Sequence, residues 1–365
     1  MNGFSFKIVR NRTEQGDRYL KRFTALFAAV GLSSVLLLSG CNNDKVAESK
    51  VEEEDKLSIV ATIFPQYDFA RQIVGDCADV SMLIGAGEES HTYEPTPQDI
   101  ITIQNADVFI YVGGESESWV DGVLESFDTS NMKIINMMEC VDVVEEELVE
   151  GMEDAGDDEH FHDNEGENDS NGGVDKTQSG NATADSAEEA EYDEHIWTSV
   201  SNAQVITQKI ADAVCSADKD NTEIYRSNCE KYLSDLSALK RKINGIVSNA
   251  ERNTIVFGDR FPLRYFADEF GLDYYAAFPG CAEQSEPSVG TVAFLVDKVR
   301  EENIPVIFKL ELSNGKIADT IAESTKAEVL TFNSCHNMPL QDFLDGVTYL
   351  DLMEQNCEAL EKALY

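Results

Sequence analysis

The chain has 365 residues with 69 acidic and 28 basic side chains, so its formal net charge is −41 at pH 7. A surface this negative repels nucleic acid and anionic lipid, and it suits a cationic ligand. We therefore expect no nucleic-acid partner.

Residues 1–40 are predicted to be a bacterial lipoprotein signal peptide. A basic segment precedes an apolar run at 23–38, which ends just before Cys41. The run is shorter than the ~20 apolar residues that cross a bilayer, and this order of segments is typical of an export signal. Cys41 supplies the thiol that carries the lipid. We expect an exported protein, anchored by Cys41 to the outer face of the cytoplasmic membrane, with a flexible polar tether at 41–55.

A first α/β lobe is predicted for residues 56–220. Helix-length segments separate short runs of β-branched apolar residues, which is typical of parallel α/β layering. The predicted strands are Leu57–Ile63, Val80–Ile84, Val108–Val112 and Lys133–Asn136. The predicted helices between them are Gln66–Val74, Thr96–Asn105 and Trp119–Phe127.

An acidic insertion interrupts this lobe at 151–194. It holds sixteen acidic residues and a single Lys, so it cannot bury enough apolar surface to order itself. His160 and His162 lie inside it between carboxylates. They either gather metal weakly beside a binding site or belong to a loop that only solubilises the protein.

Residues 221–250 are predicted to form one long linker helix, because apolar side chains recur there at three- and four-residue steps. A second α/β lobe is expected at 251–365, built like the first. Its predicted strands are Asn253–Phe257, Asp273–Ala276, Pro305–Leu310 and Glu328–Phe332. Its predicted helices are Ser288–Glu302, Lys316–Lys326 and Tyr349–Leu364.

The chain contains five histidines, and imidazole is the commonest protein ligand for zinc and related metals. His91 follows the second predicted strand, at the strand end where open α/β sheets bind ligands. His195 stands where the acidic insertion returns to ordered chain. Both are candidate metal ligands.

The segments around these histidines resemble cluster A-I substrate-binding proteins of zinc and manganese ABC transporters. The resemblance extends over roughly residues 56–365. It is carried by Ser90–Pro97, Asp193–Trp197, the acidic loop, Glu286–Ser288 and Gly346–Met353. It implies two α/β lobes joined by a rigid helix, a metal in the cleft between them, and delivery of that metal to an ABC permease. His91 and His195 would be the ligands from the first lobe.

The second lobe departs from the family pattern. Members usually place a His or Glu after the first strand of that lobe, where this sequence has Val256–Phe266 with no His. The Asp that follows the last strand in the family is matched here by a Cys335-His336 pair. His336 is the expected second-lobe ligand and Asp259 the alternative. Three imidazoles with a carboxylate or water would complete a zinc tetrahedron.

Cys281 and Cys335 both follow predicted strands of the second lobe. A disulfide between them is the favoured interpretation for an exported protein, and metal ligation by the thiolates is the alternative.

The favoured function is a monomeric zinc receptor for import. Manganese is the rival metal, since its sites prefer carboxylate oxygen. No His-Glu-x-x-His, nucleophile-elbow or phosphate-loop motif is present, so we expect no enzymatic activity. A surface adhesin with a structural metal is the remaining alternative.

Overall fold

The computed structural model describes residues 56–88, 92–152, 192–281 and 287–365. Residues 55–365 form one compact unit. Cys41, His91, His160 and His162 lie outside the described residues, so the predictions made for them are not addressed by this structure. Within the described part of the chain, no helix is both long enough and apolar enough to cross a membrane.

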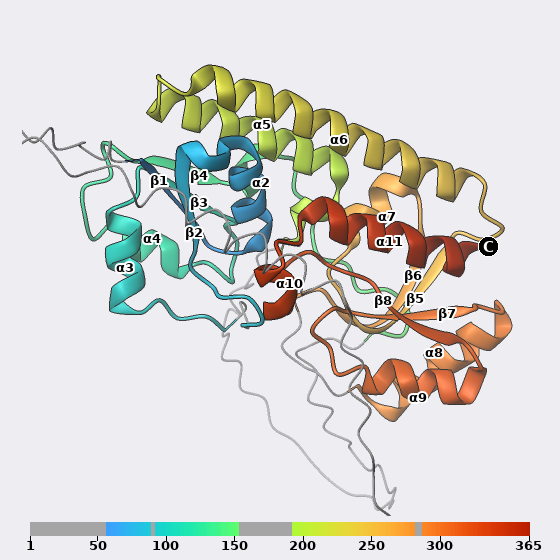
Figure 1. The fold of residues 1–365 in the computed structure, drawn as a ribbon. Coiled ribbons are helices and arrows are strands. Elements are labelled where there is room, and N and C mark those ends of the chain that lie inside the picture. The colour runs from blue at the N-terminus through green and yellow to red at the C-terminus, as the bar shows by residue number, and fades with distance from the viewer. Residues whose placement is uncertain (1–55, 89–91, 153–191, 282–286) are drawn as a thin grey trace, which may run out of the picture. The chain divides into compact units, whose positions relative to one another are not determined.

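The first lobe contains a parallel four-stranded sheet in the order β2-β1-β3-β4 (Figure 1). Successive side chains of its strands point to opposite faces. On β1 and β3, Ile59 and Val108 pack with helices α2 and α5, whereas Val60 and Phe109 pack with α3 and α4. The strands are β1 (Leu57–Ala61), β2 (Ala78–Met82), β3 (Val108–Tyr111) and β4 (Lys133–Asn136). The helices are α2 (Phe64–Val74), α3 (Pro97–Gln104), α4 (Trp119–Leu124) and α5 (Val200–Ala217).

Several elements of this lobe differ from the sequence prediction by one to three residues at an end, and one helix was not predicted. Strand β2 begins and ends two residues earlier than expected. Its side chains alternate between the sheet face and solvent, so its first residues lack the apolar run by which the sequence pattern identifies a strand. Helix α5 is not among the predicted helices. Ser199 precedes its first residue, and the Ser199 hydroxyl accepts a hydrogen bond from the backbone N–H of Asn202 and so caps the helix.

Helix α6 (Thr222–Ser248) has 27 residues and is about 40 Å long at 1.5 Å per residue. It lies where the long linker helix is predicted. One face packs on α2 and α5 of the first lobe, and the same helix also packs on α7 and α11 of the second. Seven side chains of this helix are buried, namely Tyr225, Cys229, Tyr232, Leu236, Leu239, Ile243 and Ile246.

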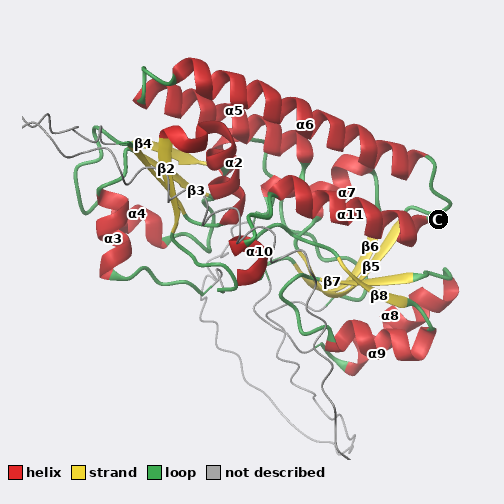
Figure 2. Cartoon of the chain, in the orientation of Figure 1, coloured by secondary structure: helices red, strands yellow, loops and turns green. Residues whose placement is uncertain are grey.

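The second lobe contains another parallel four-stranded sheet, in the order β6-β5-β7-β8 (Figure 2). Val256 packs with α8 and α9 on one face, and Phe257 packs with Phe266 and Phe332 on the other, beneath α7 and α11. The strands are β5 (Thr254–Phe261), β6 (Asp273–Pro279), β7 (Val306–Lys309) and β8 (Glu328–Thr331). The helices are α7 (Arg264–Phe270), α8 (Val289–Glu301), α9 (Lys316–Thr325), α10 (Leu340–Leu344) and α11 (Tyr349–Leu364).

The predicted fold class, two α/β lobes with parallel sheets and a long helix between them, is confirmed. One detail bears on the site. Strand β5 runs four residues beyond its predicted end, with a shift of register between Phe257 and Arg260. Asp259 therefore lies in the irregular part of a strand and not in the loop that follows it.

Candidate metal site

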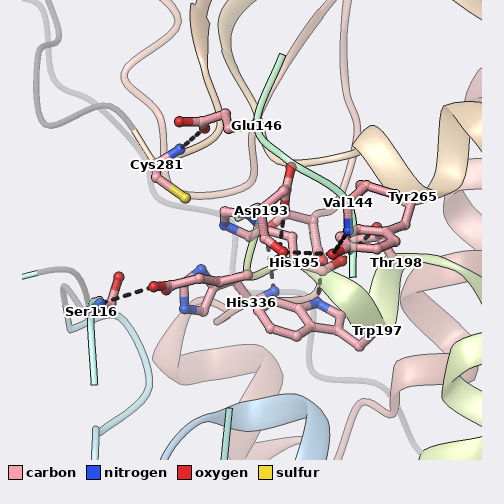
Figure 3. Close-up of polar contacts among 12 residues, drawn as sticks. Ser116, Val144, Glu146, Asp193, His195, Trp197, Thr198, Tyr265, Cys281 and His336 are labelled. Atoms are coloured by element: carbon pink, nitrogen blue, oxygen red, sulfur yellow. Dashed lines mark hydrogen bonds and ion pairs between the residues drawn. The ribbon is translucent and has the colours of Figure 1, made fainter. Parts of the chain in front are cut away.

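His195 lies at the start of a short 3-10 turn (Ile196–Thr198) and is only 1% exposed. Its Nδ1 is 3.0 Å from Oδ1 of Asp193, and its backbone N–H donates to the same oxygen at 2.7 Å (Figure 3). A carboxylate at Nδ1 favours the tautomer that carries its proton there and has its lone pair on Nε2. In that tautomer, Nε2 is the ring nitrogen through which the imidazole could ligate a metal.

Asp193 is itself held by a tyrosine from the second lobe. The hydroxyl of Tyr265 on α7 donates to the backbone oxygen of Asp193 at 2.7 Å, and it accepts from the backbone N–H of Val144 at 3.1 Å. The backbone N–H of Asp193 donates to the oxygen of Val144 at 3.0 Å. The segment that carries His195 is therefore fixed on both sides, which preserves the direction of the imidazole.

His336 lies beside His195 and Trp197, as Figure 3 shows. Its ring centroid is 5.4 Å from that of His195 and 5.1 Å from that of Trp197. The residue comes from the loop after β8, two positions beyond Ser334. The structure thus brings together two of the three predicted imidazole ligands, one from each lobe.

The loop that carries His336 has buried polar partners. Glu311 accepts hydrogen bonds from the backbone N–H of Ser334 at 2.9 Å and from its hydroxyl at 2.7 Å. Burial raises the pKa of the Glu311 carboxyl above its ordinary value. The indole N–H of Trp197 donates to the backbone oxygen of Ser334 at 2.9 Å. Cys335 adopts a left-handed backbone conformation with φ of 58°, which is uncommon for a residue other than glycine.

Asp259, the alternative second-lobe ligand, accepts two backbone hydrogen bonds. Its Oδ1 accepts from the N–H of Arg260 at 2.9 Å, and its Oδ2 accepts from the N–H of Leu310 at 3.2 Å. Both contacts lie within the second lobe and tie β5 to the end of β7. Each carboxylate oxygen has a second lone pair that these two hydrogen bonds do not use. Asp259 could therefore still ligate a metal.

Cys281 follows a turn that approaches the His195 imidazole, and it is not joined to Cys335. Both cysteines are free thiols, so the disulfide expected between them is not formed in this structure. A Cβ atom added to Gly280 would lie 3.3 Å from Cε1 of His195, so the turn before Cys281 lies close to the ring. Burial, and then the negative charge of Glu146, hold the pKa of the Cys281 thiol well above its usual range.

Glu146 is a residue of this site that the sequence analysis missed. Its Oε1 accepts a hydrogen bond from the backbone N–H of Cys281 at 2.9 Å, which links the segment before the acidic insertion to the second lobe. Burial raises the pKa of Glu146, Asp193 adds to the rise, and His195 opposes it. A charged residue near an acidic insertion has no periodicity that would distinguish it, so the sequence carries no signal for this role.

No group of three His, Cys, Asp or Glu side chains within the described ranges is arranged to hold a metal ion. His91, the third predicted imidazole, lies outside those ranges. The donor types present beside His195 still fit zinc, which prefers imidazole nitrogen backed by a hydrogen-bonded carboxylate.

Glu117, in the loop after β3, is another buried carboxylate, and it lies near Glu194. Oε2 of Glu117 accepts from the backbone N–H groups of Val112 at 2.6 Å and Gly113 at 3.0 Å, and the residue is 6% exposed. Burial raises its pKa from 4.5 to about 7, and the nearby charge of Glu194 contributes to the rise. Glu194 accepts from the backbone N–H of Ser116 at 2.9 Å. Glu117 thus organises the loop after β3.

We expect Glu117→Gln to flatten part of the dependence of stability on pH. The folded chain holds this proton up to about pH 7, whereas the unfolded chain loses it near 4.5. Glu117 therefore stabilises the fold fully below about 4.5, and this contribution disappears as pH rises through about 7, a change of roughly 3 kcal/mol. Urea unfolding at several pH values between these limits, on wild type and variant, measures the difference. A difference that is constant with pH would show that Glu117 is ionised in the fold throughout.

Comparison with known proteins places this chain in a family. Residues 59–363 match the family described as zinc-uptake complex component A, periplasmic. The high-affinity zinc uptake system protein ZnuA of Bacillus subtilis (strain 168) is 30% identical over 344 residues, which are 94% of this chain and 98% of that protein.

Two solved structures agree with the sequence comparison. The metal-dependent lipoprotein YcdH of Bacillus subtilis has a TM-score of 0.66 and 28% identity, over 85% of this chain and 100% of that one. The Zn(II)-bound ZnuA-like domain of Streptococcus pneumoniae AdcA has a TM-score of 0.63 and 25% identity, over 85% and 99%. This chain therefore belongs to the family of the periplasmic zinc-uptake component A, ZnuA.

Proposed function

We propose that this protein is an extracytoplasmic receptor that captures zinc and delivers it to an ABC importer. The observation that carries the proposal is the pair of imidazoles of His195 and His336, whose ring centroids are 5.4 Å apart and which come from different lobes. Asp193 hydrogen-bonds the first of them. Such a pair binds a metal between two lobes, and membership of the zinc-uptake family supports zinc as that metal.

The proposed ligands are His91, His195 and His336, with a carboxylate or water in the fourth position. Asp259 is the alternative from the second lobe. Three neutral imidazoles favour zinc over manganese, because manganese sites take more carboxylate and carbonyl oxygen. The insertion that holds His160 and His162 would gather metal near the site.

The proposed location and partners follow from the N-terminal segment and the family. Cys41 would carry a lipid that holds a monomer at the outer face of the cytoplasmic membrane. The membrane partner would be the permease of an ABC importer. The role is binding and transfer, so we propose no catalytic activity.

Calorimetric titration tests this proposal, with zinc and manganese each added to the chain and to two variants, His336→Ala and Asp259→Asn. We expect one zinc per chain, weaker manganese binding, a loss of zinc affinity in His336→Ala and little change in Asp259→Asn. The opposite order of the two variants would assign the second-lobe ligand to Asp259. A chain that binds neither metal would exclude the receptor function and favour an adhesin.

A further inference from the structure

Asn337 follows His336 in the loop after β8 and is 6% exposed. Its side chain reaches the first lobe. Nδ2 donates to the backbone oxygen of Gly85 at 3.1 Å and to that of Glu88 at 2.8 Å, and Oδ1 accepts from the backbone N–H of Gly87 at 3.2 Å. One side chain of the second lobe thus makes three hydrogen bonds to a single short segment of the first.

The hydrogen-bonding capacity of this amide is fully used. An asparagine side chain has two donor hydrogens and an oxygen with two lone pairs. Both hydrogens go to the first lobe, and the oxygen also accepts from the backbone N–H of Met338 at 2.7 Å. Neither water nor another side chain is needed to satisfy it. A buried amide satisfied in this way has one preferred orientation.

The segment that Asn337 contacts is a tight turn after β2. The carboxylate of Glu88 accepts from the backbone N–H of Gly85 at 3.0 Å, and the backbone N–H of Glu88 donates to the oxygen of Gly85 at 3.1 Å. Gly87 has a φ of 82°, a conformation that glycine adopts readily. Three residues after this turn the chain reaches His91.

The loop that presents Asn337 is anchored to its own lobe. The backbone N–H of Asn333 donates to Oδ1 of Asn356 at 2.7 Å, and Glu311 holds Ser334. Because the loop is fixed on one side, the three hydrogen bonds of Asn337 fix the turn of the other lobe relative to it.

We propose that Asn337 is a positioning residue that fixes the Gly85–Glu88 turn of the first lobe against the loop that carries His336. The proposal rests on the zinc-binding function proposed above. The separation of His195 from His336 is then set before metal arrives, which reduces the ordering that binding requires. Zinc leaves slowly as long as this connection holds, and breaking it opens the site.

The test compares wild type with Asn337→Ala and Asn333→Ala in the whole chain. Asn333 is the matched control, because it is an asparagine of the same loop with the same 6% exposure. Among the described residues its side chain bonds Leu352 and Asn356, both in the second lobe. Two quantities are measured: amide hydrogen exchange at Gly87 in the metal-free chain, and the rate of zinc release to an excess of chelator. Urea unfolding monitors overall stability.

We expect Asn337→Ala to speed exchange at Gly87 and zinc release by about tenfold or more, because three hydrogen bonds between the lobes are lost. Asn333→Ala should leave exchange at Gly87 at the wild-type rate, even if urea unfolding shows lower stability. Asn337→Asp has the same shape and lacks both N–H donors, so it provides a second variant if the alanine variant does not fold.

Wild-type exchange at Gly87 and wild-type zinc release in both Asn337 variants would overturn the proposal. So would equal acceleration by Asn333→Ala, because the effect would then be general to the loop. A wild-type chain that binds no zinc would overturn the zinc-binding function and the ligand-positioning role together. The exchange measurement would still report whether Asn337 connects the two segments.

Discussion

Replacing His195 by alanine should lower the affinity of the chain for zinc by at least about a hundredfold. Loss of a partner behind a ligand already costs 10- to 100-fold in many metal sites, and loss of the ligand itself should cost more. His195 is buried, and Asp193 orients its imidazole. Calorimetric titration with zinc, or competition with a chelator of known affinity, measures the change.

Asp193→Asn is the matched variant for this experiment. An asparagine keeps the shape of Asp193 and can still accept from Nδ1 of His195, but it removes the negative charge. We expect a smaller loss of zinc affinity, about 10- to 100-fold. Zinc binding by His195→Ala within about threefold of wild type would remove His195 from the ligand set. Urea unfolding of both variants separates loss of a ligand from loss of the fold.

Replacing Trp197 by alanine should lower the free energy of unfolding by about 3–5 kcal/mol, the range for large aromatic residues removed from a core. Trp197 is 1% exposed and packs against both His195 and His336. Its backbone oxygen accepts from the hydroxyl of Tyr349 at 2.8 Å, and its indole donates to the oxygen of Ser334. Its removal leaves a cavity where the two lobes meet. Urea unfolding of wild type and variant measures the change.

Trp197→Phe removes the hydrogen bond and keeps part of the packing. Phenylalanine keeps an aromatic ring beside His336 but has no N–H to donate, so the backbone oxygen of Ser334 loses a buried partner. We expect a loss of about 1–3 kcal/mol. The alanine and phenylalanine variants should therefore differ by the packing of the phenyl ring. Equal stability of wild type and Trp197→Ala would show that this contact between the lobes contributes nothing to folding.

Most of the fold could be predicted from local patterns. Runs of β-branched residues separated by helix-length segments identify the strands of both sheets, and β4 and α11 have the predicted bounds. Helix α5 was missed although its apolar residues at Val200, Ala203, Ile206 and Ile210 recur at three- and four-residue steps. The predicted bounds of edge strand β2 are two residues too late, because its solvent-facing side chains are polar and do not indicate where strand pairing begins.

The candidate site was predictable only in part. The motif around His195 and the Cys-His pair at Cys335-His336 named two imidazoles, and the structure brings these rings to 5.4 Å between centroids. The position of Cys281 and Cys335 after predicted strands of an exported protein favours a disulfide, but both thiols are free. The predicted ends of strands indicate which residues can lie at one edge of a sheet. They do not indicate which two side chains at that edge contact each other.

The sequence by itself determined the alternation of strands and helices, the long helix between the lobes and the histidines available for zinc, since these follow from local periodicity and residue type. Only the tertiary structure decided what holds the histidines in place. Tyr265 bonds the backbone of Asp193 across 72 residues, Trp197 bonds Ser334 across 137, and Gly87 bonds Asn337 across 250. A buried polar group must find a partner, and packing in three dimensions, not nearness along the chain, determines which partner it meets.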